Sequence, residues 1–293
     1  MADTILKLNN LRKVYIMGNK KVAIKAQEAI HKLHHAYEKA VSKNNTEKIS
    51  EIEIRLEKAQ DLFDKEKYVE TYHFLTGKKI KEGKNEKGVV VHALNGVDID
   101  IKKGEMVAIM GPSGSGKSTL LNMLGLLDEP TTGQIFLRGV NVTGISQNKL
   151  PEVRSSELGF VFQSFNLIPT LTAIENVMLP LRYGKTPRNE RRALAEKSLR
   201  LVGLGDRLTH TPNELSGGQR QRVAIARSLV NKPAIIFGDE LTGELDIKMT
   251  KEIMDLIVRL NQHGQTFIIV THNPEVAKLC TRTITIVDGK VAK

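Results

Sequence analysis

The chain has 293 residues and a formal net charge of +11 at pH 7, from 44 lysines and arginines against 33 aspartates and glutamates. Its single cysteine, Cys280, excludes an internal disulfide, and no apolar run approaches the roughly 18 residues that a membrane-spanning helix requires. We therefore expect a protein that is soluble by itself, without a secretion signal, whose partner is anionic: nucleic acid, a phosphate ligand or the cytoplasmic face of a membrane.

Two alternating, β-rich segments come first along the chain, at residues 4–15 and 89–101, and we expect them to pair antiparallel. Short continuous apolar runs then follow at 106–110, 159–163, 234–238, 266–272 and 283–289. Helical patterns separate most of these runs, including 117–127, 187–203, 219–231 and 248–262. Buried strands that alternate with helices indicate a mostly parallel sheet covered on both sides. The sequence thus predicts an α/β fold with an antiparallel β subdomain.

Residues 19–87 separate the first two strands and differ in composition, being rich in lysine and glutamate and without a strand pattern. Apolar residues recur there at helical spacing, at Val22, Ala26, Ile30, Leu33, Tyr37 and Val41 and again at Ile49, Ile52, Leu56, Ala59 and Phe63. The segment SKNNT between the two sets is typical of a turn, with Thr46 as the N-cap of the second helix. We predict an inserted antiparallel helical hairpin, with a third short helix at YVETYHFLTG.

His31 and His35 lie four residues apart on the first helix of this insertion, with His34 and His73 nearby in sequence. This spacing places two imidazoles on one helix face, as a metal site would require. No cysteine accompanies them and no acid is uniquely placed, so we favour a solvated helix face. Two interpretations of the insertion stay open: a partner-docking arm, which we prefer, and an inert decoration.

The strongest motif is GPSGSGKST, residues 111–119, which follows the strand MVAIM and opens the helix STLLNMLGLL. It matches G-x-x-x-x-G-K-[ST], the pattern of a phosphate-binding loop (P-loop), in which glycines let backbone N–H groups face phosphate oxygens. Lys117 supplies a cation for the β- and γ-phosphates and Ser118 a hydroxyl for Mg²⁺. The predicted nucleotide-binding residues of the loop are Gly111, Pro112, Ser113, Gly114, Ser115, Gly116, Lys117, Ser118 and Thr119.

A second chemical signal is the run AIIFGDE, in which a buried strand ends at two adjacent acids, Asp239 and Glu240. In P-loop nucleotidases, an acid that ends a neighbouring strand holds Mg²⁺ through water. Asp239 occupies that place, and Glu240 beside it is positioned to orient or deprotonate the attacking water. The predicted chemistry is therefore hydrolysis of a nucleotide bound with Mg²⁺.

The pentapeptide LSGGQ, residues 215–219, together with the P-loop and the GDE triplet, resembles the signature of ATP-binding-cassette (ABC) transporter ATPases. The resemblance covers residues 4–18 and about 88–291. Three further segments look like the lipoprotein-release and macrolide-export subfamily: GFVFQSFNLIPTLTAIENVMLPL, MLGLLDEPTTG and VHALNGVDIDIKKGE. The resemblance implies an ATP-binding core in 1–18, 88–150 and 229–293, a helical subdomain in 151–228 and the inserted hairpin in 19–87.

The resemblance also assigns roles to single residues. Tyr15 matches the aromatic residue that stacks on adenine, and His272 the histidine that touches the γ-phosphate. Gln163 matches the glutamine that contacts Mg²⁺ and the attacking water, so the predicted metal-site residues are Ser118, Gln163 and Asp239. In the family each ATP lies between the P-loop of one chain and the signature of a second copy, with an aspartate in the contact loop. The matching residues here are Ser216, Gly217, Gly218, Gln219 and Asp246.

Two partners follow from the resemblance. One is a second copy of the chain, in a head-to-tail homodimer that closes on two MgATP and opens after hydrolysis. The other is a separate membrane permease, which the chain joins on the cytoplasmic side of the cell membrane. We expect no nucleic-acid partner. The insertion follows Tyr15 by only a few residues, so it is also placed to bias the adenine-binding loop.

One loop departs from the family pattern. After the predicted strand AIIFG, the family usually reads D-E-P-T-[SG]-A-L-D. This chain reads DELTGELD there, with Leu241 for proline and Glu244 for alanine. Leu241 lacks the fixed φ of proline. Glu244 adds a carboxylate to the loop that presses on the partner's P-loop, where negative charge opposes nucleotide binding. Two interpretations of Glu244 stay open: an acid that faces solvent or pairs with a lysine, which we favour, and one that slows the ATPase or makes it partner-dependent.

Three other classes of nucleotide-binding protein fit the sequence less well. A DNA-maintenance ATPase of this superfamily has a long coiled coil between P-loop and signature, and residues 120–214 are too few for one. A translation-type protein has two cassettes, and a second P-loop is absent. A regulator that binds ATP without turnover stays open because of the altered loop after Glu240, although the presence of Gln163, Asp239, Glu240 and His272 argues against it.

Overall fold

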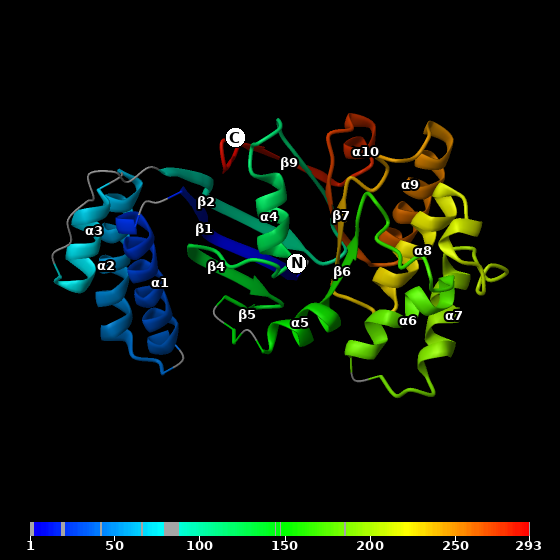
Figure 1. Cartoon of the computed structure of the whole chain (residues 1–293), viewed down its shortest axis with the longest axis horizontal. Coiled ribbons are helices and arrows are strands. Elements are labelled where there is room, and N and C mark those ends of the chain that lie inside the picture. The colour runs from blue at the N-terminus through cyan, green and yellow to red at the C-terminus, as the bar shows by residue number, and fades with distance from the viewer. Residues whose placement is uncertain are drawn as a thin grey trace.

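A computed structural model describes residues 3–18, 21–41, 43–65, 67–78, 88–143, 145–146, 148–184 and 186–292 of the chain. The described elements form an elongated molecule (Figure 1). The helices of the insertion lie at one end, two β-sheets lie in the middle, and a group of helices lies at the other end. Segments far apart in sequence therefore meet in the middle of the molecule.

Six strands form the central sheet, in the order β10-β9-β3-β8-β7-β6. They are β3 (Met106–Met110), β6 (Leu158–Val161), β7 (Ile235–Asp239), β8 (Thr266–Val270), β9 (Arg282–Val287) and β10 (Lys290–Val291). All neighbours from β9 to β6 pair parallel, whereas β10 pairs antiparallel with β9 at the edge. The mostly parallel sheet predicted from the apolar runs is confirmed.

A second, antiparallel sheet has the order β2-β1-β4-β5. Its strands are β1 (Thr4–Gly18), β2 (Gly88–Lys102), β4 (Thr132–Leu137) and β5 (Val140–Asn141). The predicted antiparallel pair of N-terminal strands is confirmed, and it is longer than expected, because pairing continues to Gly18 and Gly88. The sequence did not indicate β4 or β5: β4 begins at a Thr-Gly pair, and β5 is only two residues long.

Helices cover the central sheet on both faces and divide the interior into two hydrophobic cores. They are α4 (Lys117–Leu124), α5 (Leu150–Glu157), α6 (Ala173–Tyr183), α7 (Arg191–Leu201), α8 (Gly217–Leu229), α9 (Ile247–Gln262) and α10 (Pro274–Lys278). Because strand side chains alternate between faces, Phe237 packs in the core that includes α4 and the antiparallel sheet, and Ile236 in the core of α6 to α9. None of the helices in the described ranges is long and apolar enough to cross a membrane.

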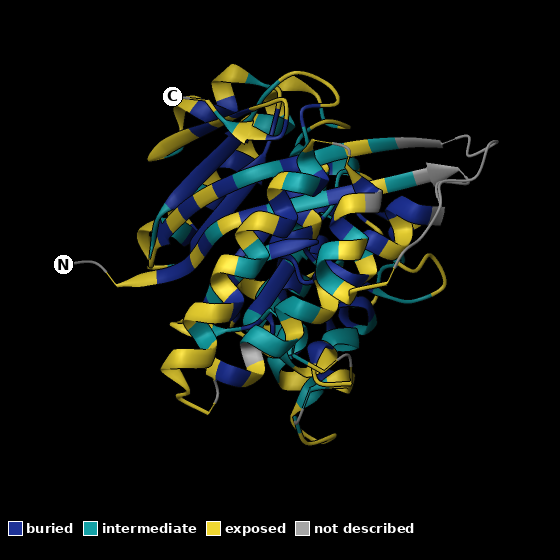
Figure 2. Ribbon diagram, turned by 90° about the vertical axis from the view of Figure 1, so that its left-hand side faces the viewer, coloured by how far each residue is buried: buried dark blue, intermediate teal, exposed yellow. Residues whose placement is uncertain are grey.

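The insertion folds as three helices, α1 (Lys21–Val41), α2 (Thr46–Asp64) and α3 (Tyr68–Thr76). It has a small core of its own, and its outward helix faces are exposed (Figure 2). The predicted antiparallel hairpin with a third short helix is confirmed. The predicted N-cap is wrong by one residue: Asn45, not Thr46, caps α2, and its side chain accepts a hydrogen bond from the Lys48 N–H at 3.1 Å.

The division of the chain into an ATP-binding core and a helical subdomain stays a prediction. One strand does not fit the predicted boundary: β6 lies inside the range 151–228, but it pairs with β7 as the edge of the central sheet. The reason is that a short run such as Leu158–Val161 carries no sign of its partner, which lies more than 70 residues further along the chain.

Candidate active site

The P-loop joins the carboxyl end of β3 to the start of α4. Its backbone requires glycine at Gly116, where φ is +103° and a Cβ would lie 2.4 Å from the carbonyl oxygen of Ala93. The ammonium of Lys117 donates hydrogen bonds to the carbonyl oxygens of Gly111 and Pro112, at 2.9 and 2.8 Å. The loop therefore curls around a cation at the N-terminus of a helix, which is a site suited to phosphate.

Two acids meet this loop at the same edge of the sheet, because the carboxyl ends of parallel strands lie together. Asp239 ends β7, and burial together with the charge of Glu240 raises the pKa of its carboxyl group. Glu240 has a left-handed backbone (φ +47°), and its N–H donates to the carbonyl oxygen of Val270 at 2.9 Å. A left-handed glutamate is strained, and such residues cluster at functional sites.

The structure brings the three predicted catalytic residues together. His272 follows β8, and its Nδ1 lies 2.9 Å from Oε1 of Glu240. Gln163 lies against the turn that begins at Glu240: a Cβ on Gly243 would come within 2.7 Å of the Gln163 amide nitrogen. The Gly243 N–H in turn donates to the Glu240 carbonyl oxygen at 2.9 Å. A carboxylate, an imidazole and an amide therefore converge beside the P-loop.

Tyr15, on β1, lies next to the end of the P-loop, with 36% of its surface exposed. Its hydroxyl donates to Asp128 Oδ2 at 3.0 Å and is also hydrogen-bonded to Thr119, the last residue of the motif. Burial and the nearby Asp128 carboxylate raise the pKa of the Tyr15 phenol. Lys13 lies over the ring at 5.0 Å and donates to Asp128 at 2.7 Å. Sequence analysis missed Lys13 and Asp128, although Lys13 shares a strand face with Tyr15.

The signature segment begins α8, at the helical end of the molecule. Ser216 is the N-cap of α8 and forms a capping box with Gln219, whose N–H donates to the Ser216 hydroxyl at 3.3 Å. Asp246 similarly caps α9, accepting from the Met249 N–H at 2.7 Å. In Figure 1, α8 lies on the far side of β6 and β7 from α4. The signature thus forms a second helix N-terminus, apart from the P-loop.

The two unusual residues of the loop after Glu240 differ in environment. Leu241 is 3% exposed and packs over Gly238, and its carbonyl oxygen accepts from Gln221 at 2.7 Å. Its side chain belongs to the hydrophobic core of α6 to α9. Glu244 is exposed, and over the described ranges it forms no ion pair. Leu241 therefore anchors the loop by packing, while Glu244 presents its charge to solvent.

The histidines of the insertion do not converge. His31 lies 3.7 Å from Glu129, outside the insertion, and His73 is on α3. Within the part of the chain that the structure describes, no group of three or more His, Cys, Asp or Glu side chains is arranged to hold a metal ion.

Comparisons with known proteins agree with this geometry. Residues 94–243 match the family model described as ABC transporter. An uncharacterized ABC transporter ATP-binding protein of Thermotoga maritima is 52% identical over 203 residues, which are 69% of this chain and 87% of that protein. The lipoprotein-releasing system ATP-binding protein LolD of Aquifex aeolicus is 51% identical over 199 residues, 68% of this chain and 88% of LolD.

A third relative is named as a combined ATP-binding and permease protein, and a solved cassette structure is also similar. The macrolide export ATP-binding/permease protein MacB of Marinobacter nauticus is 49% identical over 205 residues, which are 70% of this chain but only 32% of MacB. A dimeric, post-hydrolysis structure of an ATP-binding cassette bound to ADP and Pi is 35% identical, with a TM-score of 0.66 and coverage of 98% of this chain and 97% of that one. The chain therefore belongs to the ABC transporter family, as an ATPase subunit of the lipoprotein-release and macrolide-export group.

Proposed function

We propose that this chain binds and hydrolyses MgATP at the carboxyl ends of the parallel strands of its central sheet. It does so as one half of a homodimer that drives a separate membrane permease. The observation that carries the proposal is the convergence of Glu240, His272 and Gln163 beside the P-loop. Adenine stacks on Tyr15 in this proposal, and Lys117 moves from the loop carbonyls to the β- and γ-phosphates.

The residues present suit Mg²⁺. Ser118, Gln163 and Asp239 offer a hydroxyl, an amide and a carboxylate oxygen, the ligand type that this ion prefers. The raised pKa of Asp239, beside a second carboxylate, indicates a site where a cation would relieve burial and repulsion. When bound, Mg²⁺ would neutralise charge on the β- and γ-phosphates.

Glu240 acts as the general base. Its carboxylate accepts the proton of the attacking water, and its strained backbone fixes its direction. His272, whose Nδ1 lies 2.9 Å from the carboxylate, holds it in place and would contact the γ-phosphate of bound ATP. The amide of Gln163, which lies against Gly243 in the turn after Glu240, would orient the water. The left-handed φ of Glu240 and the packing of Leu241 position this group without the proline usual in the family.

The second half of the site comes from a second copy of the chain. The N-terminus of α8, with Ser216, Gly217, Gly218 and Gln219, is an anion site distant from its own P-loop. In a head-to-tail dimer it would cover the γ-phosphate bound to the partner's P-loop, with Asp246 in the contact loop. The dimeric form of the similar ADP-bound cassette supports this arrangement.

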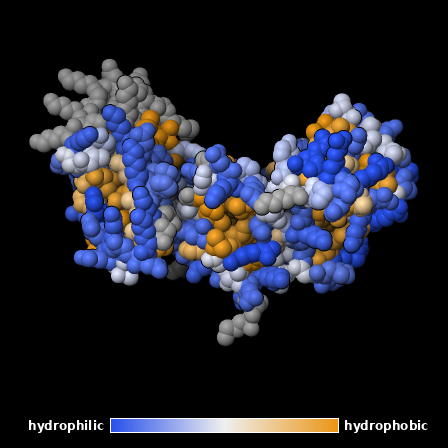
Figure 3. All heavy atoms as spheres, turned by 90° about the horizontal axis from the view of Figure 1, so that it is seen from below, coloured by the Kyte–Doolittle hydropathy of each residue, from blue (hydrophilic) through white to orange (hydrophobic). Residues whose placement is uncertain are grey.

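A groove between α5, β6, α6 and α8 is the proposed permease-docking surface. It has a volume of about 460 Å³, and its lining includes Leu127, Phe160, Phe162, Pro180 and Tyr183. Tyr183 is 80% exposed and Leu127 51% exposed, which is unusual for large apolar side chains. Seen from below, the surface is notched between the β-rich middle and the helical end, and hydrophobic side chains gather beside the notch (Figure 3). An apolar helix of the permease would fit there, at the cytoplasmic face of the membrane.

The altered loop yields a prediction about rate. We expect the variant Glu244→Ala to hydrolyse ATP about two- to fivefold faster than the wild type, because it removes an exposed negative charge from the dimer contact and leaves the packing of Leu241 intact. Steady-state phosphate release at saturating MgATP is the measurement. If Glu244→Ala gains nothing in turnover, Glu244 is a solvated acid without influence on the cycle.

The proposal as a whole is tested with the purified wild-type chain. We expect phosphate release from MgATP that stops when EDTA removes the metal, and a shift to a dimer in size-exclusion chromatography when ATP is added. Tight ATP binding with no phosphate release under any condition would support a regulator without turnover instead.

A further inference from the structure

The insertion shares its hydrophobic core with the strand that carries Tyr15. Val14 is buried in this core with Val22, Ala26 and Phe63, and Ile16 packs against the same cluster. Because side chains alternate along a strand, Val14 and Ile16 face the insertion while Tyr15 faces the opposite side, towards Asp128. Both chain neighbours of Tyr15 are therefore held by the inserted helices.

One side chain of the insertion also bonds this strand directly. β4 pairs with β1 only as far as Arg12, so beyond that point the edge of β1 needs other partners. The Val14 N–H donates to the Thr131 hydroxyl oxygen at 3.0 Å. The amide nitrogen of Gln27, on α1, donates to the Val14 carbonyl oxygen at 3.0 Å and to the same hydroxyl oxygen at 3.2 Å. Gln27 thus joins the strand to the loop that follows α4.

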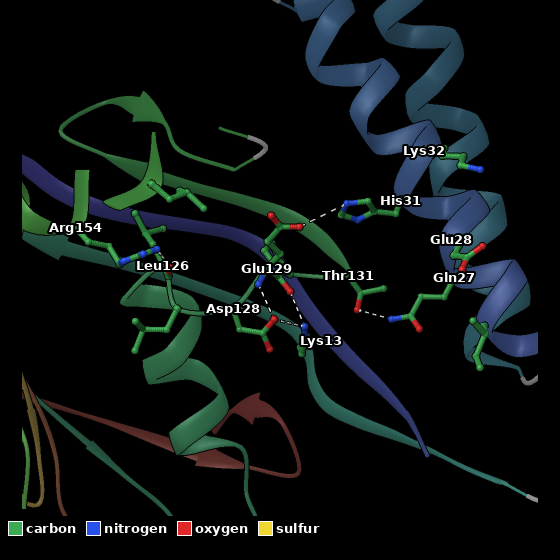
Figure 4. A pocket seen from close by; sticks show the side chains of 14 residues that line it. Lys13, Gln27, Glu28, His31, Lys32, Leu126, Asp128, Glu129, Thr131 and Arg154 are labelled. Atoms are coloured by element: carbon green, nitrogen blue, oxygen red, sulfur yellow. Dashed lines mark hydrogen bonds and ion pairs between the residues drawn. The ribbon is translucent and has the colours of Figure 1, made fainter. Parts of the chain in front are cut away.

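That loop holds the other side of Tyr15. Asp128 accepts from the Tyr15 hydroxyl, and Lys13 donates to both Asp128 and the Glu129 carbonyl oxygen, each at 2.7 Å. Figure 4 shows Gln27 reaching this loop from α1 and Lys13 reaching it from β1, beside a cavity of about 540 Å³. A weaker second contact joins the insertion to the same loop, where His31 lies 3.7 Å from Glu129.

We propose that Gln27 is a positioning residue for the adenine site: by joining Val14 to Thr131, it fixes the distance between the strand of Tyr15 and the loop of Asp128. The inference rests on the proposed role of Tyr15 in stacking on adenine. Gln27 does not touch the nucleotide in this account. It acts on the base alone, since the phosphates are held by the P-loop, to which the insertion makes no described hydrogen bond.

The test is the variant Gln27→Glu, which keeps the shape of the side chain but replaces the donor with a carboxylate that the Val14 carbonyl oxygen repels. Isothermal titration measures the Kd of ATP and of inorganic tripolyphosphate, which has no base. We expect the Kd of ATP to rise about three- to tenfold, because the strand and the loop lose the two hydrogen bonds that the Gln27 amide donates, and the Kd of tripolyphosphate to stay unchanged. The kcat at saturating ATP should also stay unchanged.

Controls separate this role from a structural one. Gln262→Glu makes the same chemical change on the exposed end of α9 and should leave both Kd values unchanged. Thr131→Val removes the hydroxyl that accepts from both Val14 and Gln27, and it should weaken ATP binding as Gln27→Glu does. Thr131→Ser keeps the hydroxyl and should bind ATP as tightly as the wild type. In a Tyr15→Ala background, Gln27→Glu should add nothing.

Three results would overturn the inference. If Gln27→Glu weakened the binding of ATP and of tripolyphosphate equally, Gln27 would support the fold in general. If Tyr15→Ala weakened ATP binding but Gln27→Glu and Thr131→Val did not, the proposed nucleotide site would stand and Gln27 would have no role in it. An unchanged Kd of ATP in Tyr15→Ala would refute the adenine role of Tyr15, and with it the inference.

Discussion

Glu240→Gln is expected to lower ATP turnover by a factor of about 10²–10⁴, the usual contribution of a positioned general base, while ATP still binds. The substitution keeps the size of the side chain and removes its capacity to take a proton. The backbone of Glu240 is fixed by its bond to the Val270 carbonyl oxygen, so the amide should occupy the place of the carboxylate. Phosphate release gives the turnover, and equilibrium titration with ATP gives the binding.

A matched control is Glu275→Gln, on the exposed face of α10 and paired with Lys278. It removes one negative charge a few residues beyond His272 and should change turnover by less than about twofold, as expected of a surface charge. If Glu240→Gln kept more than half of the wild-type turnover, Glu240 would not be the base, and the site would need another proton acceptor.

Gly116→Ala is expected to cost about 2–4 kcal/mol of unfolding free energy and to abolish measurable ATP binding. Two causes add at this position. The backbone has φ of +103°, and the new methyl group would lie 2.4 Å from the Ala93 carbonyl oxygen, so either β2 or the P-loop must move. Movement of the loop turns its N–H groups away from the phosphates. Chemical denaturation measures the first effect and ATP titration the second.

Gly114→Ala separates backbone strain from collision. Gly114 also has a positive φ, +76°, but a Cβ there would meet no atom within 4 Å. The left-handed backbone strain of alanine should lower the unfolding free energy of this variant by about 1–2 kcal/mol. ATP binding should be weakened but still measurable. Equal losses in the two variants would contradict the tight contact between the P-loop and β2.

The central sheet and the nucleotide loop were predictable because their signals are local. A strand such as Met106–Met110 is a continuous apolar run, and the P-loop residues are consecutive. The antiparallel strand β4 was not predictable, since its place in the sheet depends on pairing with β1, more than 100 residues away. The N-cap of α2 moved from Thr46 to Asn45 because both residues suit a cap, and only the turn geometry decides.

Some residues of the candidate site could likewise be predicted from the sequence, and others could not. Asp239 and Glu240 follow one another at a strand end, so their sequence alone suggested a role. The role of His272 came only from the family resemblance, and its contact with Glu240, 32 residues earlier in the chain, was not predicted. Lys13, Asp128, Gln27 and Thr131 were missed, since their contacts with the strand of Tyr15 bring together three distant segments. Such contacts leave no periodic signal in the chain.

The central claim, that each ATP is hydrolysed between two copies of the chain, is tested most directly by mixing two inactive variants. Lys117→Ala removes the P-loop cation, and Gly217→Asp puts a negative charge on the α8 N-terminus, which suits the helix but repels phosphate. A mixed head-to-tail dimer joins the intact P-loop of one variant to the intact signature of the other. We predict that an equimolar mixture regains about a quarter of wild-type turnover, since half of the dimers are mixed and each has one intact site of two. A mixture no more active than its separate components, although mixed dimers form, would contradict the claim.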